Sequence, residues 1–232
     1  MSELIKCTSL TKRFGSVTAL DEIDLSLQSG KIVGLLGPNG SGKTTIIKII
    51  NGLLTPTSGS IEVCGMKPGV ETKKLVAYLP DKSCLYTYMT VKQIVTMYAD
   101  FYADFRSELA YTMLNNLGID PSRPLKTLSK GNQEKVALIL VMSRNAKLYV
   151  LDEPIAGVDP ATRDYIVSTI INNYNPDASV IISTHLIYDI ESVLDEVIFI
   201  NSGRIALHGN VEELKAEKGK SVDELFREVF RW

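Results

Sequence analysis

The chain of 232 residues contains 45% hydrophobic and 22% charged residues, and its formal net charge is −2. This is the composition of an ordinary globular protein, and the balance of charge argues against a nucleic-acid-binding surface. The three cysteines, Cys7, Cys64 and Cys84, are far apart, which argues against a structural zinc site and fits a reducing cytosol.

Short β-type runs separated by glycine and proline open the chain. Ile5–Leu10, Asp24–Leu27 and Ile61–Cys64 are predicted to be antiparallel strands, because turn residues lie between them. Lys31–Gly37 is more apolar and is predicted to be a strand of a buried, largely parallel sheet. A helix is predicted to follow it at Thr44–Leu53.

The segment between this strand and helix, Gly37–Thr44, reads GPNGSGKT and matches the phosphate-binding P-loop pattern. Glycines let backbone N–H groups converge on phosphate oxygens, and the helix N-terminus adds its positive end. Lys43 is predicted to reach the β- and γ-phosphates, and the Thr44 hydroxyl to ligate Mg²⁺. A glycine-rich turn without chemical use is disfavoured, because strand, glycines, lysine and threonine are all in register. The predicted nucleotide-binding residues of this segment are Asn39, Gly40, Ser41, Gly42, Lys43, Thr44 and Thr45.

After a predicted strand at Leu75–Leu79 the pattern becomes helical. Apolar residues recur at helical spacing over Val91–Tyr102 and Ser107–Leu117, and Asn132–Ser143 is apolar almost all round, as in a buried helix. The longest apolar run, Val136–Met142, is far shorter than the roughly 18–20 residues that cross a bilayer. If the protein works at a membrane, we expect another chain to span it.

Three further apolar runs are predicted to be strands: Leu148–Leu151, Val180–Ser183 and Val197–Asn201. The first ends in Asp152 and Glu153, at the strand edge where phosphate sites form. Alone, this pair would be interpreted as the surface end of a strand. Beside a P-loop, Asp152 is predicted to ligate Mg²⁺ and Glu153 to take a proton from an attacking water.

The alternation of strands and helices predicts an α/β fold. We expect a P-loop NTPase core with a mainly parallel sheet, an N-terminal antiparallel β subdomain and an inserted α-helical subdomain. Residues 1–232 are predicted to form a single ATP-binding domain, with the helical subdomain at about 82–144 and a C-terminal helical tail at about 205–232. The amphipathic end of the tail, Val222–Trp232, either packs on the core or mediates dimer contacts.

Ser129 and Gly131, just before the apolar helix, are by themselves only a helix N-cap and a turn. In order and approximate spacing to Asp152, however, they resemble the signature motif of ABC ATPases. His185 resembles the switch histidine of that family, although a lone histidine after a strand is more often structural. Phe14 resembles the aromatic that stacks on adenine, with an ordinary turn aromatic as the alternative.

Further matches extend the resemblance over nearly the whole chain. Ala156–Asp159 resembles the loop that links two ATP sites, and Asp159 followed by Pro160 also predicts a helix N-cap. Asp81 departs from the family, which usually has glutamine there; a carboxylate can ligate Mg²⁺ but cannot donate a hydrogen bond when ionised. Lys130 is a second departure, and we expect it to face solvent.

The resemblance implies a chain that binds ATP and Mg²⁺ and hydrolyses ATP. The implied catalytic residues are Lys43, Glu153 and His185; the metal ligands are Thr44, Asp81 and Asp152; Phe14, Ser129 and Gly131 complete the nucleotide contacts. Two such domains would pair head to tail, as a homodimer or as a heterodimer with a related subunit. Ser129 and Gly131 would then contact the ATP of the partner.

The function implied is that of the motor subunit of a transporter, closest in pattern to drug, peptide or antibiotic-resistance exporters, with separate permease subunits. The chain would be cytoplasmic and peripheral on the inner face of the cell membrane. Leu85–Thr90, rich in tyrosine and methionine, either meets the permease or packs within the helical region.

Two other functions remain as alternatives. A soluble ABC ATPase acting on a ribosome or nucleic-acid complex is disfavoured by the single domain and by the lack of a heptad insertion or basic patch. A regulatory ATP-binding module that hydrolyses poorly has only Asp81 in its support.

Overall fold

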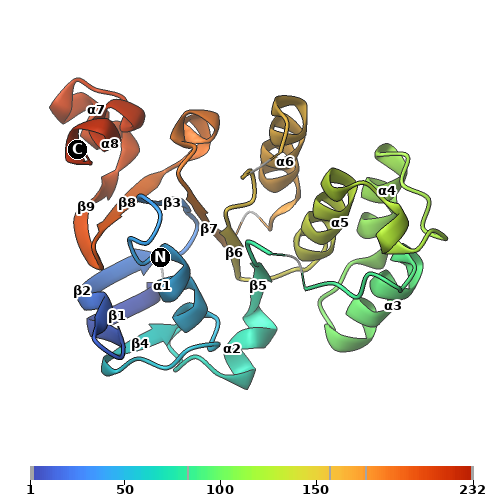
Figure 1. Ribbon diagram of the computed structural model, residues 1–232, viewed down its shortest axis with the longest axis horizontal. Helices are drawn as coiled ribbons and strands as arrows, with labels where there is room; N and C mark the ends of the chain where they lie inside the picture. The colour runs from blue at the N-terminus through green and yellow to red at the C-terminus, as the bar shows by residue number, and fades with distance from the viewer. Residues whose placement is uncertain (1–2, 83, 157, 176, 231–232) are drawn as a thin grey trace.

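The computed structural model describes residues 3–82, 84–156, 158–175 and 177–230. Gly157 of the predicted linking loop and Trp232 of the predicted tail lie outside these residues. The described chain forms two sheets with helices between and around them (Figure 1). The predicted α/β fold is confirmed.

The smaller sheet is antiparallel and contains the N-terminal strands. Its order is β2-β1-β4, with β1 at Glu3–Phe14, β2 at Val17–Gln28 and β4 at Ser58–Val63. β1 and β2 are longer than their apolar cores predicted, because they continue to the turn at Gly15 through residues of which many are polar or exposed.

The larger sheet has the order β5-β6-β7-β3-β8-β9. Its strands are β3 (Ile32–Leu36), β5 (Val76–Leu79), β6 (Leu148–Asp152), β7 (Ser179–Thr184), β8 (Glu196–Asn201) and β9 (Arg204–Asn210). All neighbours pair in parallel except β8 and β9. β7 therefore lies between β3 and β6, although it follows both in the sequence.

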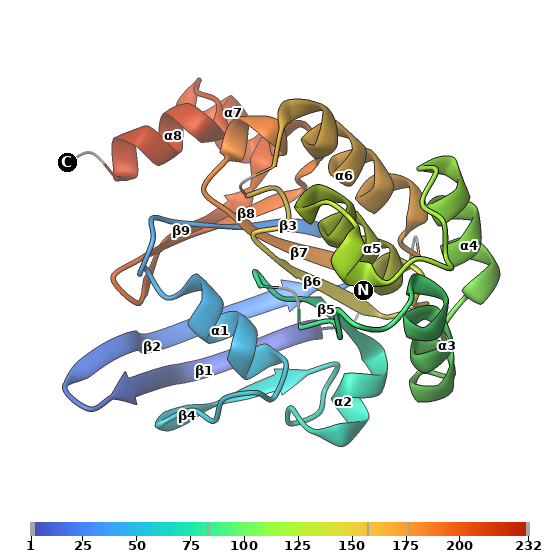
Figure 2. The same ribbon diagram turned by 45° about the vertical axis from the view of Figure 1, so that its right-hand side comes forward.

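Helix α1 (Lys43–Ile50) lies between the two sheets (Figure 2). Its four isoleucines pack against residues of both sheets, including Val33 and Leu35 of β3. The alternate residues of β3, Ile32 and Leu36, belong to the core on the opposite face. Because apolar layers cover both faces, the strands of this sheet are almost continuously apolar.

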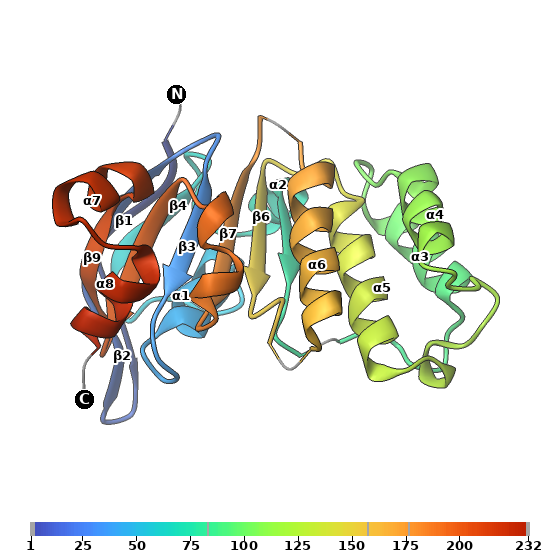
Figure 3. The ribbon, with the colours of Figure 1, turned by 90° about the horizontal axis from the view of Figure 1, so that it is seen from above.

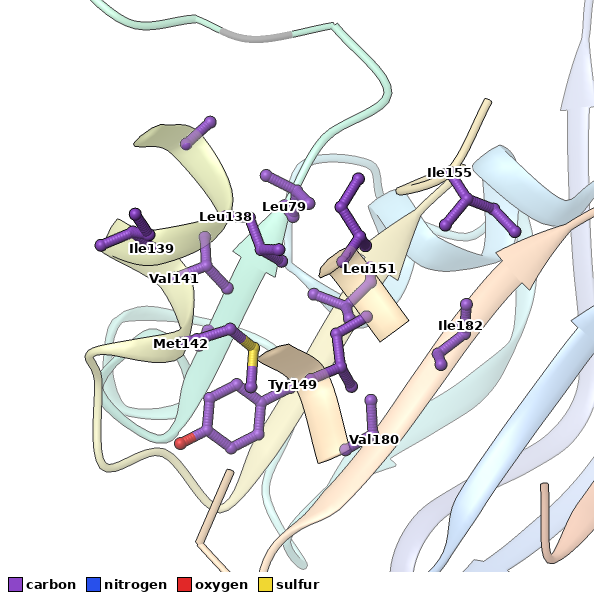
Figure 4. Packing of buried hydrophobic residues seen from close by; sticks show 14 of the residues in the cluster. Leu79, Leu138, Ile139, Val141, Met142, Tyr149, Leu151, Ile155, Val180 and Ile182 are labelled. Atoms are coloured by element: carbon purple, nitrogen blue, oxygen red, sulfur yellow. The ribbon is translucent and has the colours of Figure 1, made fainter. Parts of the chain in front are cut away.

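The helices between residues 91 and 173 lie on the face of the large sheet away from α1. α5 and α6 lie side by side, with α4 and α3 beyond α5 (Figure 3). Side chains of α5, such as Leu138, Val141 and Met142, lie against the strands near Leu79 and Tyr149 (Figure 4). The helices are α3 (Val91–Phe101), α4 (Ser107–Asn116), η1 (Leu125–Thr127), α5 (Lys130–Met142) and α6 (Pro160–Asn173).

Local signals explain where several of these helices begin. Thr90 and Gln93 form a capping box at α3, and Ser129 accepts a hydrogen bond from the Asn132 backbone at the start of α5. The carboxylate of Asp159 accepts from the Thr162 backbone at the start of α6. The helices between residues 91 and 142 share one core with the sheet, and a separate helical subdomain stays a prediction.

The C-terminal segment differs from the helical tail predicted from about residue 205. It begins with β9, followed by α7 (Val211–Lys218) and α8 (Val222–Val229). The strand forms because Ser202 and Gly203, both at positive φ, make a tight turn that returns the chain antiparallel to β8. The short helix α2 (Val70–Leu75) was not predicted from the sequence.

The last helix packs on the core through its aromatic side chains. α8 packs Phe226 and Phe230 against Phe199 of β8, so the amphipathic end packs on the core within this chain. Among the residues that the structure describes, none of the helices combines the length and apolar character needed to cross a bilayer.

Candidate active site

The P-loop connects the end of β3 to the first residue of α1. Gly42 has a φ of +116°, and a Cβ there would lie 2.7 Å from the Ala19 carbonyl oxygen, so only glycine fits. The Lys43 ammonium donates hydrogen bonds to the carbonyl oxygens of Gly37 at 2.7 Å and Pro38 at 3.2 Å. The lysine is thereby held inside its own loop, with its side chain 6% exposed.

An open pocket of about 380 Å³ lies over this loop. Nine of the predicted site residues line it: Asn39, Gly40, Gly42, Lys43, Thr44, Thr45, Asp81, Glu153 and His185. These residues come from the P-loop, from the ends of β5 and β6, and from the end of β7. Parallel strands bring their carboxyl ends to one edge, which is why segments so distant in sequence meet here.

Asp152 lies at the end of β6, beside the pocket and almost fully buried. Its Oδ1 accepts a hydrogen bond from the Ser183 hydroxyl at 2.6 Å and lies 3.4 Å from the Thr44 hydroxyl. Burial raises the pKa of Asp152 above its usual value, the two hydrogen bonds lower it, and the negative charge of Asp81 raises it further. The carboxylate thus sits where a nearby positive charge would stabilise its ionised form.

Glu153 adopts a left-handed backbone conformation, with φ +52°. Such a conformation is strained for a residue with a Cβ and persists where the surroundings hold it. Its backbone N–H donates to both the carbonyl and the hydroxyl oxygens of Ser183, each at 3.0 Å. The turn directs its carboxylate toward Nζ of Lys43, at 3.6 Å, and Nδ1 of His185, at 3.1 Å.

The oxygen atoms near Asp152 suit a hard divalent cation. Its Oδ2 is buried and has no hydrogen-bond partner among the described residues, and the Thr44 hydroxyl lies 3.4 Å from the other oxygen, Oδ1. Mg²⁺ is usually held by one or two carboxylates together with phosphate oxygens. Groups of three or more His, Cys, Asp or Glu that would hold a metal ion are absent from the described part of the chain. Thr44, Asp152 and Asp81 therefore fit a metal that arrives with a phosphate ligand.

Besides Asp152, four predicted residues lie outside this pocket. Ser41 is buried beneath the loop, and Ser129 and Gly131 lie at the start of α5 and do not line the pocket. Phe14 lies at the β1–β2 turn with 48% of its surface exposed, and Lys12 places its ammonium 5.0 Å from the ring centre. The side chain of Lys130 is 84% exposed, in agreement with its predicted contact with solvent.

An apolar groove of about 330 Å³ lies between β5 and the helices α3 and α5. Tyr78, Cys84, Tyr86 and Tyr98 are among its lining residues, and Tyr86 is 53% exposed. Burial raises the pKa of Tyr98 to about 12, so its hydroxyl stays neutral. Pro80 lines the groove, and the next residue, Asp81, lines the pocket over the P-loop.

Ser183 is the site residue that sequence reasoning missed. It was included only as the last residue of a predicted strand, whereas its hydroxyl contacts both acidic residues of the site. A serine in an otherwise apolar strand, two residues before the candidate histidine, was the available signal.

Comparisons with known proteins identify one family for the chain. The ABC transporter family model matches residues 20–156. An uncharacterised ABC transporter ATP-binding protein of Methanocaldococcus jannaschii is 32% identical, covering 92% of this chain and 80% of the relative. The SkfA peptide export ATP-binding protein SkfE of Bacillus subtilis is 30% identical, covering 99% and 96%. A solved structure of the ATP-binding subunit of an ABC transporter superposes with a TM-score of 0.88 at 26% identity, covering 98% of this chain and all of the other.

Proposed function

Because this chain belongs to the ABC transporter family, as an ATP-binding and ATP-hydrolysing subunit, we propose that it drives an exporter through separate membrane-spanning subunits. The observation that carries the proposal is the meeting of Lys43, Glu153 and His185 around the open pocket over the P-loop. The peptide-export relative supports the direction of transport, since nearly the full lengths of both chains match.

ATP is proposed to bind with its phosphates in the P-loop. Asn39, Gly40 and the segment 42–45 at the start of α1 line the pocket, where their backbone N–H groups would stabilise negative charge. Lys43 would exchange its hydrogen bonds to the loop carbonyls for the β- and γ-phosphates. Phe14 offers an exposed ring for stacking on adenine, with Lys12 beside it.

The metal is proposed to be Mg²⁺, held by Thr44 and Asp152 with Asp81 as a third oxygen donor. The support is the unpartnered, buried Oδ2 of Asp152 and the position of Asp81 at the same pocket. A bound Mg²⁺ would neutralise charge on the phosphates. The residues themselves supply hard oxygen ligands and an acidic environment.

Hydrolysis is proposed to use Glu153 as the general base. Its carboxylate lines the pocket beside Lys43 of the P-loop. His185 contacts one carboxylate oxygen and Lys43 contacts the other, and the two contacts together would orient the base. His185 and Lys43 would also stabilise negative charge developing on the transferred phosphoryl group.

The working form is proposed to be a head-to-tail pair, of two copies or of this chain with a related subunit. Ser129 and Gly131 do not reach the pocket of their own chain, which supports their predicted role at the ATP of a partner. Ser129 caps the N-terminus of α5, which is the positive end of the helix dipole. In a head-to-tail pair this end would stabilise the phosphates bound to the partner.

The permease is proposed to contact the apolar groove beside Asp81, whose exposed tyrosines suit a protein interface. The protein would then work in the cytoplasm on the inner face of the membrane. A soluble ATPase of the ribosome or of nucleic acid is not favoured, because the relatives are named for transporters.

The test is a pull-down of tagged Glu153→Gln protein with ATP from detergent-solubilised native membranes, followed by mass spectrometry. Because the variant should bind ATP without hydrolysing it, a stoichiometric polytopic membrane protein is expected. Lys43→Ala protein, which lacks the phosphate contact, is the matched control and should recover less of that partner. Recovery of ribosomal or chromosomal proteins alone would contradict the transporter function. ATP turnover that Glu153→Gln leaves unchanged would show that Glu153 is not the general base.

A further inference from the structure

One buried hydroxyl connects the two acidic residues of the site. Ser183 lies in β7 directly opposite Asp152 of β6, and it is fully buried. Its hydroxyl donates to Asp152 Oδ1 at 2.6 Å and accepts from the Glu153 backbone N–H at 3.0 Å. A hydroxyl has one hydrogen to donate and lone pairs to accept, so both bonds form at once.

We infer that Ser183 is a positioning residue that orients Asp152 for the metal and holds the turn that carries Glu153. The inference rests on the metal and base roles proposed above for these two residues. Within the described part of the chain, Ser183 makes both contacts from a single strand position.

The carboxylate of Asp152 has few other restraints. Its second oxygen, Oδ2, is buried without a hydrogen-bond partner among the described residues, and Oδ1 is 3.4 Å from the Thr44 hydroxyl. The 2.6 Å bond from Ser183 has the length of a charge-assisted O–H···O⁻ bond and is therefore the stronger restraint. It engages Oδ1 and leaves the buried Oδ2 as the oxygen without a hydrogen bond, which is the one we infer would bind a cation.

Without the Ser183 hydroxyl, we expect Thr44 and Asp152 to bond to each other more closely, so that both become less available to a metal. Thr44 would be the remaining hydroxyl donor to Asp152. A shorter hydrogen bond between these two predicted metal ligands would occupy the oxygen atoms that the metal needs. The effect on Glu153 is smaller, because its N–H retains the carbonyl oxygen of Ser183 at 3.0 Å. Metal binding is therefore the first property that we expect to change.

The test measures metal and nucleotide binding separately in Ser183→Ala, Ser183→Thr and Ser183→Cys. Mn²⁺ binding to the protein with a non-hydrolysable ATP analogue is measured by electron paramagnetic resonance, and analogue binding in EDTA by calorimetry. We expect Ser183→Ala to weaken Mn²⁺ binding by about tenfold and to leave the metal-free binding unchanged. Ser183→Thr keeps the hydroxyl and should bind Mn²⁺ nearly as the original chain does, with Ser183→Cys between the two.

Ser143→Ala is the matched control. Ser143 is also fully buried, and its hydroxyl has no hydrogen-bond partner in the described part of the chain. It lies at the end of α5, so its removal should leave Mn²⁺ binding unchanged. Thermal unfolding of each variant separates a folding defect from a binding defect, and the Cys variant, of nearly the same size, serves if the Ala variant does not fold.

Two outcomes would overturn the inference. Normal Mn²⁺ binding by Ser183→Ala would show that the hydroxyl does not orient Asp152, and equal losses in the Ala and Thr variants would show that shape alone matters. Asp152→Asn separates this from the proposed function. If that variant loses Mn²⁺ while Ser183→Ala keeps it, the metal site stands and only the role of Ser183 falls; if Asp152→Asn binds normally, the proposed metal site itself is wrong.

Discussion

Nδ1 of His185 lies 3.1 Å from Oε2 of Glu153, and the other oxygen of that carboxylate, Oε1, lies 3.6 Å from Nζ of Lys43. The two contacts use different oxygens, so nitrogen atoms from two separate segments of the chain restrain the orientation of the carboxylate. His185 is 45% exposed and follows β7, whereas Lys43 is buried at the start of α1. His185 is therefore the more accessible of the two restraints.

Replacing His185 by alanine should lower ATP turnover by about 10²-fold or more while changing ATP affinity little. The reason is that Glu153 loses one orienting contact and the transition state loses one polar group, whereas the P-loop is untouched. Steady-state hydrolysis and equilibrium binding of a fluorescent ATP analogue give the two quantities.

His208 is the matched control, since the chain has only two histidines. It lies on β9, 3.5 Å from Glu196, and does not line the phosphate pocket. His208→Ala should keep normal turnover. If His185→Ala also keeps it, the proposed role of this histidine is wrong.

Replacing Asp81 by alanine should raise the Mg²⁺ concentration for half-maximal activity by about tenfold, because a candidate oxygen ligand is lost. Asp81→Gln keeps an oxygen without the charge and should show a smaller increase. Titration of ATPase activity with Mg²⁺ measures the change, and Asp100→Ala, at an exposed carboxylate on α3, should have no effect. A lower Mg²⁺ requirement in Asp81→Ala would show that Asp81 acts as a repelling charge instead of a ligand.

Arg144→Leu should lower the free energy of unfolding by about 3–5 kcal/mol. The buried guanidinium pairs with Asp104 at 2.9 Å, donates to the carbonyl oxygens of Lys74 and Val76, and lies 3.9 Å from the ring centre of Tyr102. Its loss would leave a partly buried carboxylate and backbone carbonyls without partners. Urea denaturation measures the change.

Arg204→Ala provides the comparison for a surface ion pair. Arg204 contacts Asp21 at 2.6 Å, but its side chain is 70% exposed. Solvent screens such a pair, so the expected loss of stability is only a small fraction of that for Arg144→Leu. Equal losses for the two variants would show that burial of Arg144 is not the source of its stabilising effect.

Stability should fall above about pH 9 in part because of Cys7. Burial, aided by the negative charge of Asp24, raises the pKa of the Cys7 thiol from 9.0 to about 12. Between these values the unfolded chain releases a proton that the folded protein keeps, so rising pH favours unfolding by at most about 1.4 kcal/mol per pH unit. We therefore expect the free energy of unfolding, measured by urea denaturation between pH 8 and 10.5, to fall less steeply with pH in Cys7→Ala than in the original chain. An identical fall would show that Cys7 does not contribute to this pH dependence.

Glu191→Ala should loosen α8. The Glu191 carboxylate in η3 (Glu191–Val193) accepts from the backbone N–H groups of Val222 at 3.1 Å and Asp223 at 3.3 Å, and it contacts Lys215 at 3.1 Å. A carboxylate at a helix N-terminus is worth about 1 kcal/mol. Hydrogen exchange over Val222–Val229 should accelerate about fivefold. Glu217→Ala, at an exposed residue, is the control, and unchanged exchange in Glu191→Ala would show that the aromatic contacts alone hold α8.

Local sequence carries most of the phosphate site. Glycine at 42 and lysine at 43 specify the loop geometry by themselves, because the backbone conformation and the helix start depend on adjacent residues. Asp152 and Glu153 were placed for the same reason, at the end of an apolar run. The apolar strands of the large sheet were predicted within one or two residues, since both of their faces are buried.

What local sequence does not carry is register. The pairing of Ser183 with Asp152 depends on how two strands align over 31 residues of separation, and neither strand alone contains that information. The contacts of Arg144 with Lys74 and Val76 are hidden for the same reason. The β8–β9 hairpin is different: Ser202 and Gly203 were a usable turn signal.

The insertion of β7 between β3 and β6 has a consequence for synthesis on the ribosome. The strands that carry the P-loop and the acidic pair do not pair with each other, and residues 179–184 connect them by pairing with both. A nascent chain that has reached only α6 possesses both halves of the phosphate site but cannot align them. Tight capture of nucleotide would therefore begin only after β7 has emerged, late in translation, so that unfinished chains do not sequester ATP.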